Sequence, residues 1–237
     1  MKNTKKREAT VKTPKFGCEF CGREFLRATT ELNHICQYKH RWLEKDKQGN
    51  RIGFQSWLQF YKTTTLRSKI RTYEDFIKSP YYTAFIKFGN YCAEINAINV
   101  PRYIDWLLKN KTKIDTWRSD KLYTKYLIEY LREEDPYDAI HRSIETIIRL
   151  APDEAIQPKD YLRYVNPNKI CYTITTGKIS PWILYQSTSG TKFLSTLDND
   201  QVKMISDYIN PELWAIKFLK EKDTVPHIKE LLTTGGY

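Results

Sequence analysis

The sequence lacks any long run of apolar residues. A membrane-spanning helix needs roughly 18 to 20 consecutive apolar residues, and no segment of the 237 residues approaches that length. The opening residues MKNTKKREATVK also lack the apolar core of a secretory signal. We therefore expect a cytoplasmic protein, in a reducing compartment and without a membrane partner.

The signatures of common enzyme sites are also missing. The chain contains no GxxxxGK[ST], GxGxxG, GxSxG or HExxH pattern, and His141 and His227 stand alone. The acidic cluster Glu133, Glu134 and Asp135 has the chemistry to bind a divalent metal, but it lies at an expected junction between helices, where charged turns and caps are common. We predict a non-enzymatic protein and keep a metal-dependent nuclease as the weakest alternative.

Cysteine is scarce, with five residues in all, and three of them fall in one short segment. In a reducing compartment such a group fits metal ligands better than disulfides. Cys92 and Cys171 lie in apolar stretches and are expected to be ordinary buried residues. The segment KFGCEFCGREFLRATTELNHICQYKHRW has the C-x2-C-x12-H-x5-H spacing of a zinc site, and Gly22 permits the tight turn between its two thiolates and the following chain.

The expected metal site uses Cys18, Cys21 and His34 as three ligands, with either Cys36 or His40 as the fourth. A thiolate is the stronger zinc donor, which favours Cys36. His34-x-Cys36 cannot face one point from a regular helix, however, so Cys36 as a ligand requires the helix to end near His34. Four protein ligands leave no position open for water, and we therefore predict a structural Zn²⁺ ion.

This segment resembles a C2H2 zinc finger, or its CCHC variant if Cys36 is the fourth ligand. Phe16 stands two residues before the first cysteine and Phe25 four residues after the second, as the core residues of a finger do. Leu32, the third expected core residue, stands two residues before His34, where the usual finger has three.

The resemblance implies contact with nucleic acid. If the segment docks as DNA-reading fingers do, Arg27, Thr30 and Asn33 occupy the helix positions that read bases, because Arg pairs with guanine and Asn with adenine. The alternative interpretation is that these three are polar residues of a solvated helix face. The full set of candidate nucleic-acid contacts in the segment is Arg23, Arg27, Thr30, Asn33, Lys39 and Arg41.

The positive charge is concentrated in the N-terminal part of the chain. The formal net charge of +11 divides into +7 for residues 1–53, +4 for residues 54–150 and zero for residues 151–237. Such a surplus is expected of a nucleic-acid binder, with DNA preferred to RNA as the partner. Further phosphate contacts are predicted at Arg67, Lys69, Arg71, Lys109, Lys111, Lys113 and Arg118. The alternative function is an adaptor whose finger binds a protein.

The predicted fold class is mainly α, with a small zinc-finger module followed by a multi-helix domain. We expect a flexible basic arm over residues 1–14, the module over 15–45 and one helical domain over 51–237, with the turn EKDKQGN between them. Residues 169–178, KICYTITTGK, alternate like a strand and leave room for one short β-hairpin. Helix caps are predicted at Ser79, Asn99, Asp115, Asp135 and Asn210.

Two segments beyond the finger, RIGFQSWLQFY and GKISPWILYQS, are similar to segments of uncharacterised proteins of large tailed bacteriophages. This resemblance implies a viral accessory protein in the host cytoplasm, in a DNA-related or transcription-related role. It also implies a partner in the replication or transcription machinery, and it favours Cys36 as the fourth ligand.

Overall fold

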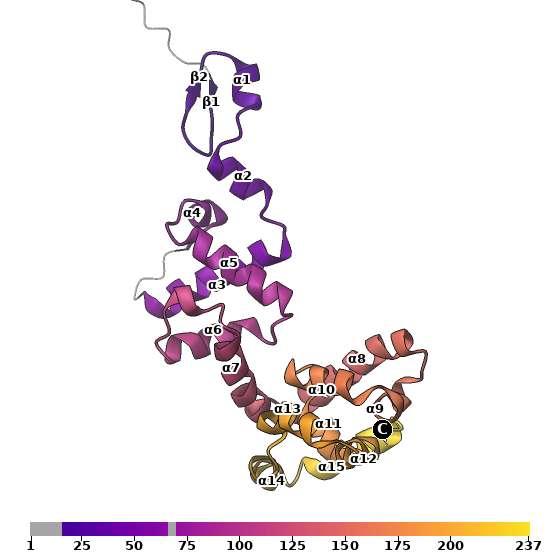
Figure 1. The fold of residues 1–237 in the computed structure, drawn as a ribbon. Coiled ribbons are helices and arrows are strands. Elements are labelled where there is room, and N and C mark those ends of the chain that lie inside the picture. The colour runs from indigo at the N-terminus through magenta and orange to yellow at the C-terminus, as the bar shows by residue number, and fades with distance from the viewer. Residues whose placement is uncertain (1–15, 66–69) are drawn as a thin grey trace, which may run out of the picture. The chain divides into compact units, whose positions relative to one another are not determined.

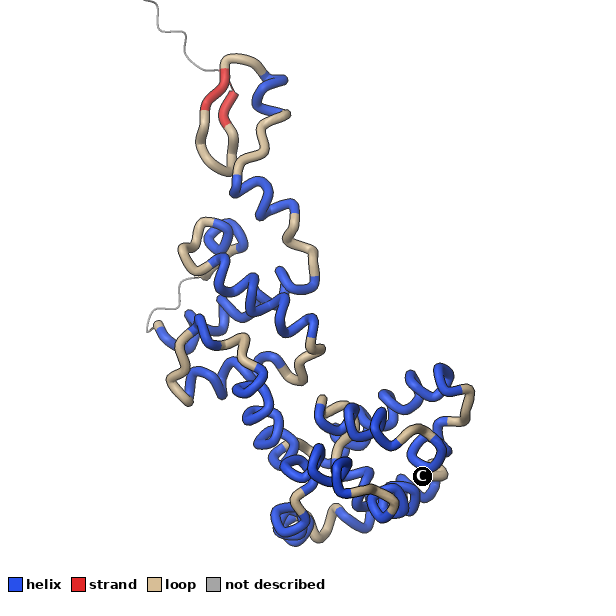
Figure 2. Tube along the Cα trace, in the orientation of Figure 1, coloured by secondary structure: helices blue, strands red, loops and turns tan. Residues whose placement is uncertain are grey.

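The computed structural model describes residues 16–65 and 70–237. Over these residues the fold is mainly helical, and one two-stranded sheet lies near the N-terminal end (Figure 1, Figure 2). The predicted fold class is confirmed. The predicted arm over residues 1–14 and the predicted contacts Arg67 and Lys69 lie outside the described residues. In the described part of the chain, no helix has both the length and the apolar character needed to cross a membrane.

Contacts divide the chain into two compact units, Met1–Trp117 and Arg118–Tyr237. The strands of the first unit are β1 (Phe16–Gly17) and β2 (Glu24–Phe25). Its helices are α1 (Ala28–Leu32), α2 (Gln37–Leu43), α3 (Gln48–Thr64), α4 (Tyr73–Ile77), α5 (Tyr82–Glu94) and α6 (Val100–Lys109), followed by the 3-10 turn η1 (Ile114–Thr116). Independent folding of residues 15–45 and of residues 51–237 stays a prediction.

The helical part of the first unit is built around the close approach of α3 and α5. A Cβ atom on Gly53 would lie 2.7 Å from the carbonyl oxygen of Phe85, and one on Gly89 would lie 2.0 Å from that of Gly49. The two backbones can approach this closely only because glycine has no side chain. Aromatic side chains fill the core beside them, and six of these are at most 2% exposed: Trp57, Phe76, Phe85, Phe88, Tyr103 and Trp117.

The predicted turn at Gly49 and Asn50 is wrong, because α3 already begins at Gln48. Both residues are buried. The Asn50 amide donates to the carbonyl oxygen of Glu44 at 2.9 Å, which satisfies its polar group at the start of the helix. Gly49 lies against Asn90 of α5, so this glycine serves helix packing rather than a turn.

The second unit is also helical over its described residues, which run from 118 to 237. Its helices are α7 (Asp120–Glu133), α8 (Pro136–Leu150), α9 (Tyr161–Tyr164), α10 (Pro167–Thr175), α11 (Pro181–Gln186), α12 (Thr188–Ser195), α13 (Asn199–Ile209), α14 (Pro211–Lys220) and α15 (Val225–Thr234), with 3-10 turns η2 (Ala151–Glu154) and η3 (Pro158–Asp160). Trp182 and Trp214 lie in its core, at 0% and 1% exposure.

The strand predicted for residues 169–178 is wrong, since α10 covers most of this range. Ile170 and Ile174 are both fully buried, and their spacing of four residues belongs to one face of a helix. The β-branched residues that suggested a strand are tolerated here because tertiary burial outweighs a weak local preference. The hairpin instead lies in the cysteine-rich segment, where β1 pairs antiparallel with β2.

Most predicted helix starts are found in the structure. The side chains of Asn99, Asp135 and Asn210 each accept a backbone N–H two or three residues on, at 2.9 to 3.2 Å. Ser79 makes a similar contact, although α5 begins only at Tyr82. The prediction for Asp115 is wrong, because the chain first makes η1 and α7 begins five residues later.

Candidate metal centre

The site starts with a β-hairpin that holds two cysteines at its turn. Phe16 pairs with Phe25 across the two strands. At the turn, the Cys18 N–H donates to the carbonyl oxygen of Arg23 at 2.9 Å, and the Gly22 N–H donates to that of Cys18 at 2.8 Å. Gly22 has a φ of +72°, a conformation that glycine adopts without strain. This knuckle brings the Cys18 and Cys21 side chains together.

The chain then returns to the knuckle through a short helix. Helix α1 ends at Leu32, and Asn33 is its C-terminal cap, so His34 follows the helix as the sequence analysis required for a Cys36 ligand. His34 Nε2 lies 3.3 Å from Cys21 Sγ, and Cys36 Sγ lies 3.9 Å from Cys18 Sγ. All four ligand atoms lie within 4.8 Å of one another.

This arrangement fits a tetrahedral ion. Zinc bonds of about 2.3 Å to sulfur and about 2.0 to 2.1 Å to imidazole nitrogen place neighbouring ligand atoms roughly 3.5 to 3.8 Å apart. The observed separations of 3.3 and 3.9 Å are close to these edges. Three thiols and one imidazole can therefore hold a metal ion, and the four protein ligands close its coordination shell.

The two knuckle thiols differ in acidity. Burial opposes ionisation of Cys18, but hydrogen bonds from the backbone N–H groups of Cys21 and Phe20 and from the Cys21 and Cys36 side chains together outweigh it, and the pKa of Cys18 lies below its ordinary value. At Cys21 the backbone contact with Arg23 favours the thiolate, yet burial and the neighbouring cysteine sulfurs raise the pKa above its ordinary value. Adjacent thiolates repel one another, so full ionisation of the cluster needs a cation between them.

Of the two candidates for the fourth position, the structure brings Cys36 into the cluster. His40 lies on α2 and is exposed. Cys36 is itself the N-cap of α2, because its Sγ accepts the backbone N–H of Lys39 at 3.3 Å. The cluster has the ligand order Cys-Cys-His-Cys, consistent with a CCHC zinc-finger-like site.

The core expected from the zinc-finger resemblance is only partly present. The Phe25 ring packs against the His34 imidazole, with ring centroids 4.8 Å apart, whereas Phe16 is 36% exposed. Leu32 is 69% exposed, so its predicted core role is wrong. The physical reason is the length of α1: five residues make little more than one turn, too short to present a second apolar position to the hairpin.

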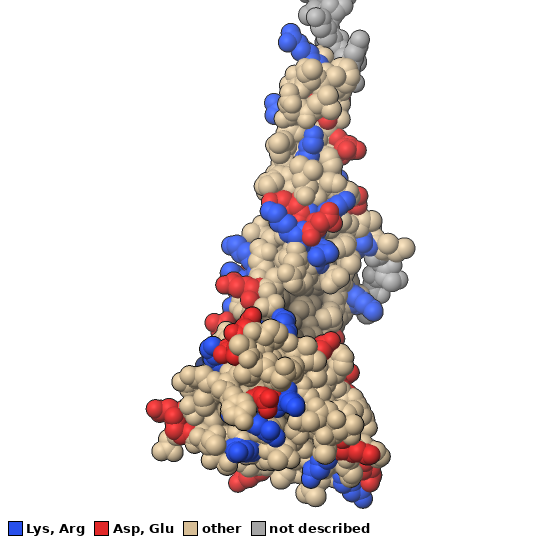
Figure 3. Space-filling model, turned by 90° about the vertical axis from the view of Figure 1, so that its right-hand side faces the viewer, with Lys and Arg blue, Asp and Glu red and all other residues tan. Residues whose placement is uncertain are grey.

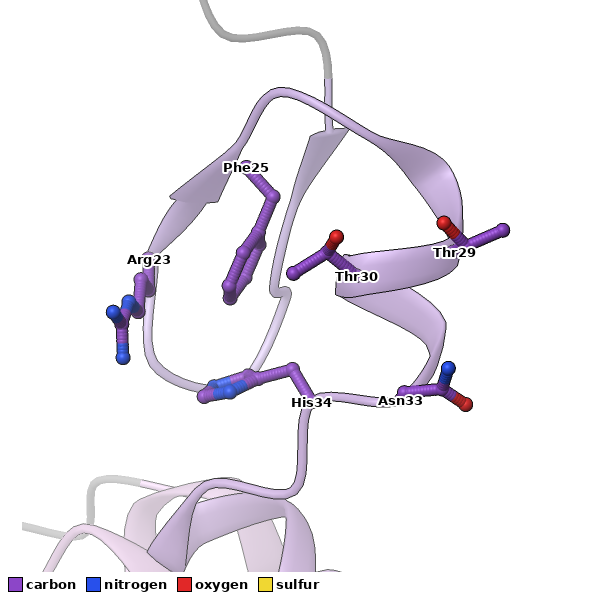
Figure 4. Close-up of a pocket in the computed structure, with 6 residues that line it drawn as sticks. All are labelled: Arg23, Phe25, Thr29, Thr30, Asn33 and His34. Carbon is purple, nitrogen blue, oxygen red and sulfur yellow. The ribbon is translucent and has the colours of Figure 1, made fainter.

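Three of the predicted nucleic-acid contacts line one open hollow beside the metal cluster. Figure 4 shows Arg23, Thr30 and Asn33 around it, together with Thr29 and the Phe25 and His34 rings. The Arg23 guanidinium lies 5.5 Å from the centre of the Phe25 ring. The hollow thus combines a cation, an aromatic ring, a hydroxyl and an amide.

The other three predicted contacts lie elsewhere in the first unit. Arg27 is exposed just before α1. Lys39 is half-buried, and its ammonium group contacts the carbonyl oxygen of Leu32 at 3.4 Å. Arg41 donates to the carbonyl oxygen of Ile77 and lies 4.2 Å over the Tyr82 ring, so it is engaged inside the protein.

The helix register implied by the zinc-finger resemblance does not fit the structure. In that register Arg27, Thr30 and Asn33 project from one continuous recognition helix. Here Arg27 precedes α1 and Asn33 follows it. A helix of five residues is about 7 to 8 Å long, which is too short to follow the major groove over several bases.

A series of aromatic contacts through Phe20, Trp42 and Tyr73, called the aromatic relay below, connects the knuckle with the helices. The sequence analysis missed it. Phe20, inside the knuckle, contacts Trp42 of α2 with ring centroids 5.9 Å apart. Trp42 contacts Tyr73 of α4 at 5.7 Å. The aromatic residue between the two knuckle cysteines was the available signal, because a solvated turn has no need of one.

The acidic cluster has a structural role in the second unit. Glu134 is 2% exposed, and its carboxylate accepts two hydrogen bonds from the Arg142 guanidinium and one from the Ser180 hydroxyl. Asp135 caps α8. Among the described residues, the side chains placed closely enough to hold a metal ion together are those of the cysteine and histidine cluster. The acids at positions 133 to 135 do not belong to it.

Comparison of the chain with family models, with curated proteins and with solved structures gives no match.

Proposed function

We propose that this chain is a zinc-binding, nucleic-acid-binding accessory protein without enzymatic activity. The zinc ion would be structural and held by Cys18, Cys21, His34 and Cys36. Thiolates and imidazole are the donors that zinc favours, and the closed four-ligand shell supports a structural role. A viral setting and a partner in replication or transcription rest on the two bacteriophage-like segments.

The observation that carries the proposal is the hollow beside the cluster. Arg23 and the Phe25 ring offer a cation and a stacking surface, while Asn33 and Thr30 offer hydrogen-bond donors and acceptors. These are the groups that bind an unstacked base and its phosphate. Because α1 is too short for groove reading, the hollow favours a single strand, with DNA preferred to RNA.

The charge of the chain supports contact through its N-terminal part rather than through a continuous basic face. Residues 1–53 carry a net charge of +7. In the view of Figure 3, Lys and Arg side chains are interspersed with Asp and Glu. Such a mixed surface gives weak binding to phosphates, so the basic N-terminal part must supply most of the affinity.

Binding of a labelled single strand by the full-length protein tests the proposal. Arg23→Gln and Lys87→Gln each remove one exposed positive charge, but only Arg23 lines the hollow. We expect Arg23→Gln to weaken binding about tenfold, as loss of one charged hydrogen bond does, and Lys87→Gln to change it less than about twofold. Equal effects of the two substitutions would contradict a role for the hollow.

A protein-binding adaptor is the second candidate, because the same segment exposes large apolar side chains. Leu26, Leu32, Ile35 and Leu43 are each 63 to 69% exposed. Apolar exposure at this density is more common in protein interfaces than on a free surface. Absence of binding to single-stranded or duplex nucleic acid at low salt would favour the adaptor.

A further inference from the structure

The second unit carries an apolar groove that is separate from the metal centre. It is formed by one face of α8 together with α15, and its lining consists of Tyr137, Asp138, Ile140, His141, Ile144, Glu145, Ile148 and Leu231. Tyr137, Ile148 and Leu231 are 43 to 52% exposed. Exposed apolar side chains gathered in one groove mark an interaction surface more often than isolated ones do.

The groove follows a regular stripe along α8. Tyr137, His141, Ile144 and Ile148 are separated by four, three and four residues, the spacing of a helix seam that packs against another helix. The stripe spans the 12 residues from Tyr137 to Ile148, or about 16 Å of helix. A partner helix of about three turns would cover it.

The opposite face of α8 is already used. Ala139, Ser143 and Ile147 are fully buried in the core of the second unit. The Ser143 hydroxyl accepts the backbone N–H of Ser180 at 2.9 Å. The helix therefore has two apolar faces, one buried in the core and one partly exposed in the groove. The second face requires another explanation.

The charge of the groove indicates the kind of partner. Its lining includes the carboxylates of Asp138 and Glu145 and no Lys or Arg, on a chain whose net charge is +11. Glu145 lies 3.6 Å from His141 within the stripe. A helix flanked by Lys or Arg would pair with these carboxylates, whereas a second copy of α8 would bring acidic side chains close to one another.

We propose that the groove between α8 and α15 binds an amphipathic helix of a partner protein. The apolar face of that helix would pack along the α8 stripe from Tyr137 to Ile148, and its basic residues would face Asp138 and Glu145. This surface is independent of nucleic-acid binding by the finger. Its failure would leave that proposal intact.

Two labelled helical peptides of about 18 residues provide the test. Both carry Leu at seam positions, and one has Lys at the flanking positions where the other has Glu. Fluorescence anisotropy with the full-length, zinc-supplemented protein measures their affinities. We expect the Lys-flanked peptide to bind at least about tenfold more tightly, and the Glu145→Lys variant to reduce that ratio several-fold.

Two isoleucine variants distinguish binding in the groove from non-specific hydrophobic binding. Ile148→Ser should weaken binding of the Lys-flanked peptide about tenfold, because it removes a side chain that the partner would bury. Ile216→Ser is the matched control, since Ile216 on α14 is 51% exposed and Ile148 is 52% exposed. It should leave the affinity unchanged. Circular dichroism checks that both variants remain folded.

Three outcomes would overturn the proposal. The first is no binding of the Lys-flanked peptide, and the second is equal affinity for the two peptides. The third is a concentration-dependent dimer, seen by sedimentation, that Ile148→Ser abolishes and Ile216→Ser does not. That result would assign the groove to a second copy of this chain.

Discussion

The sulfur of Cys36 accepts the backbone N–H of Lys39 at a distance of 3.3 Å. The same sulfur belongs to the metal-ligand cluster. One side chain therefore ends the metal-binding segment and caps the first turn of α2, where a backbone N–H would otherwise lack a partner. A metal ion bound by this cluster would therefore be coupled to the start of α2 through this residue.

The first prediction separates these two roles of Cys36. Cys36→Ala should lose both the ligand and the cap, and the cap alone should cost about 1 kcal/mol. Cys36→Ser should lose most of the metal affinity but keep the cap, whereas His40→Ala should keep both. Zinc competition with a chromophoric chelator measures the first property, and helix content by circular dichroism measures the second. Equal zinc loss in Cys36→Ala and His40→Ala would contradict this assignment.

The second prediction concerns the five cysteine thiols. Three belong to the cluster, and the other two are at most 1% exposed. Burial raises the pKa of Cys92 to about 12 and that of Cys171 above its ordinary value, which keeps both in the unreactive thiol form. A thiol reagent should therefore react with none of the five thiols in the zinc-loaded protein, with the three cluster thiols after a chelator is added, and with all five after denaturation. Three thiols that react equally fast before and after chelation would show that they hold no metal.

Part of the site could be predicted from the sequence because metal ligation is a matter of residue type and spacing. Cys18, Cys21 and His34 are recognisable from this alone, since the donor atoms must meet at one point. The fourth ligand depends on where α1 ends, and that is a property of backbone conformation. The sequence pattern therefore left Cys36 and His40 as alternatives, and the structure brings Cys36 into the cluster.

The fold follows the same division between local and tertiary information. Caps such as Asn99 and Asp135 act within a few residues, so the chain alone predicts them. Gly49 looks like a turn residue because its packing partner Asn90 lies 41 positions away in sequence, on another helix. Leu32 looks like a core residue because the zinc-finger pattern assumes a longer helix than α1. In both cases the deciding contacts lie outside the local sequence.

The third prediction tests coupling through the aromatic relay of Phe20, Trp42 and Tyr73. Removal of zinc should unfold the knuckle and thereby expose one face of Trp42. Hydrogen exchange of the α2 amides should then accelerate, while that of the α11 amides in the second unit stays unchanged. Phe20→Ala should reproduce part of this acceleration with zinc still bound. If α2 keeps full protection after chelation, the relay does not couple the metal to the helices.

The fourth prediction concerns the buried ion pair of the second unit. Removal of one partner by Glu134→Gln should destabilise this unit by about 3 to 5 kcal/mol, because Arg142 is left without its carboxylate. The double variant Glu134→Leu with Arg142→Leu should recover much of that loss. The matched control is the exposed pair of Glu154 and Lys169, where Glu154→Gln should cost less than about 1 kcal/mol. Chemical denaturation of the four proteins gives the comparison.

The last prediction concerns the salt dependence of nucleic-acid binding. Each phosphate contact with a single strand changes the slope of log affinity against log salt by about −0.7, so three to six contacts give a slope of roughly −2 to −4 for the full chain. Deletion of residues 1–35 removes 8 Lys and Arg and 4 Asp and Glu, a net charge of +4. Combined with Cys36→Ser, it leaves the cap of α2 and the Arg41 contact with Ile77 in place.

We expect this truncated protein to retain the helices from α2 onwards and to lose about half of the slope, because the remaining net charge lies in residues 36–150. Affinity at about 150 mM salt should fall further than the slope alone requires, since the hollow lined by Arg23 and Asn33 is also removed. An unchanged slope and affinity would mean that the finger contacts no phosphates. The exposed leucines of the finger would then point to a protein partner.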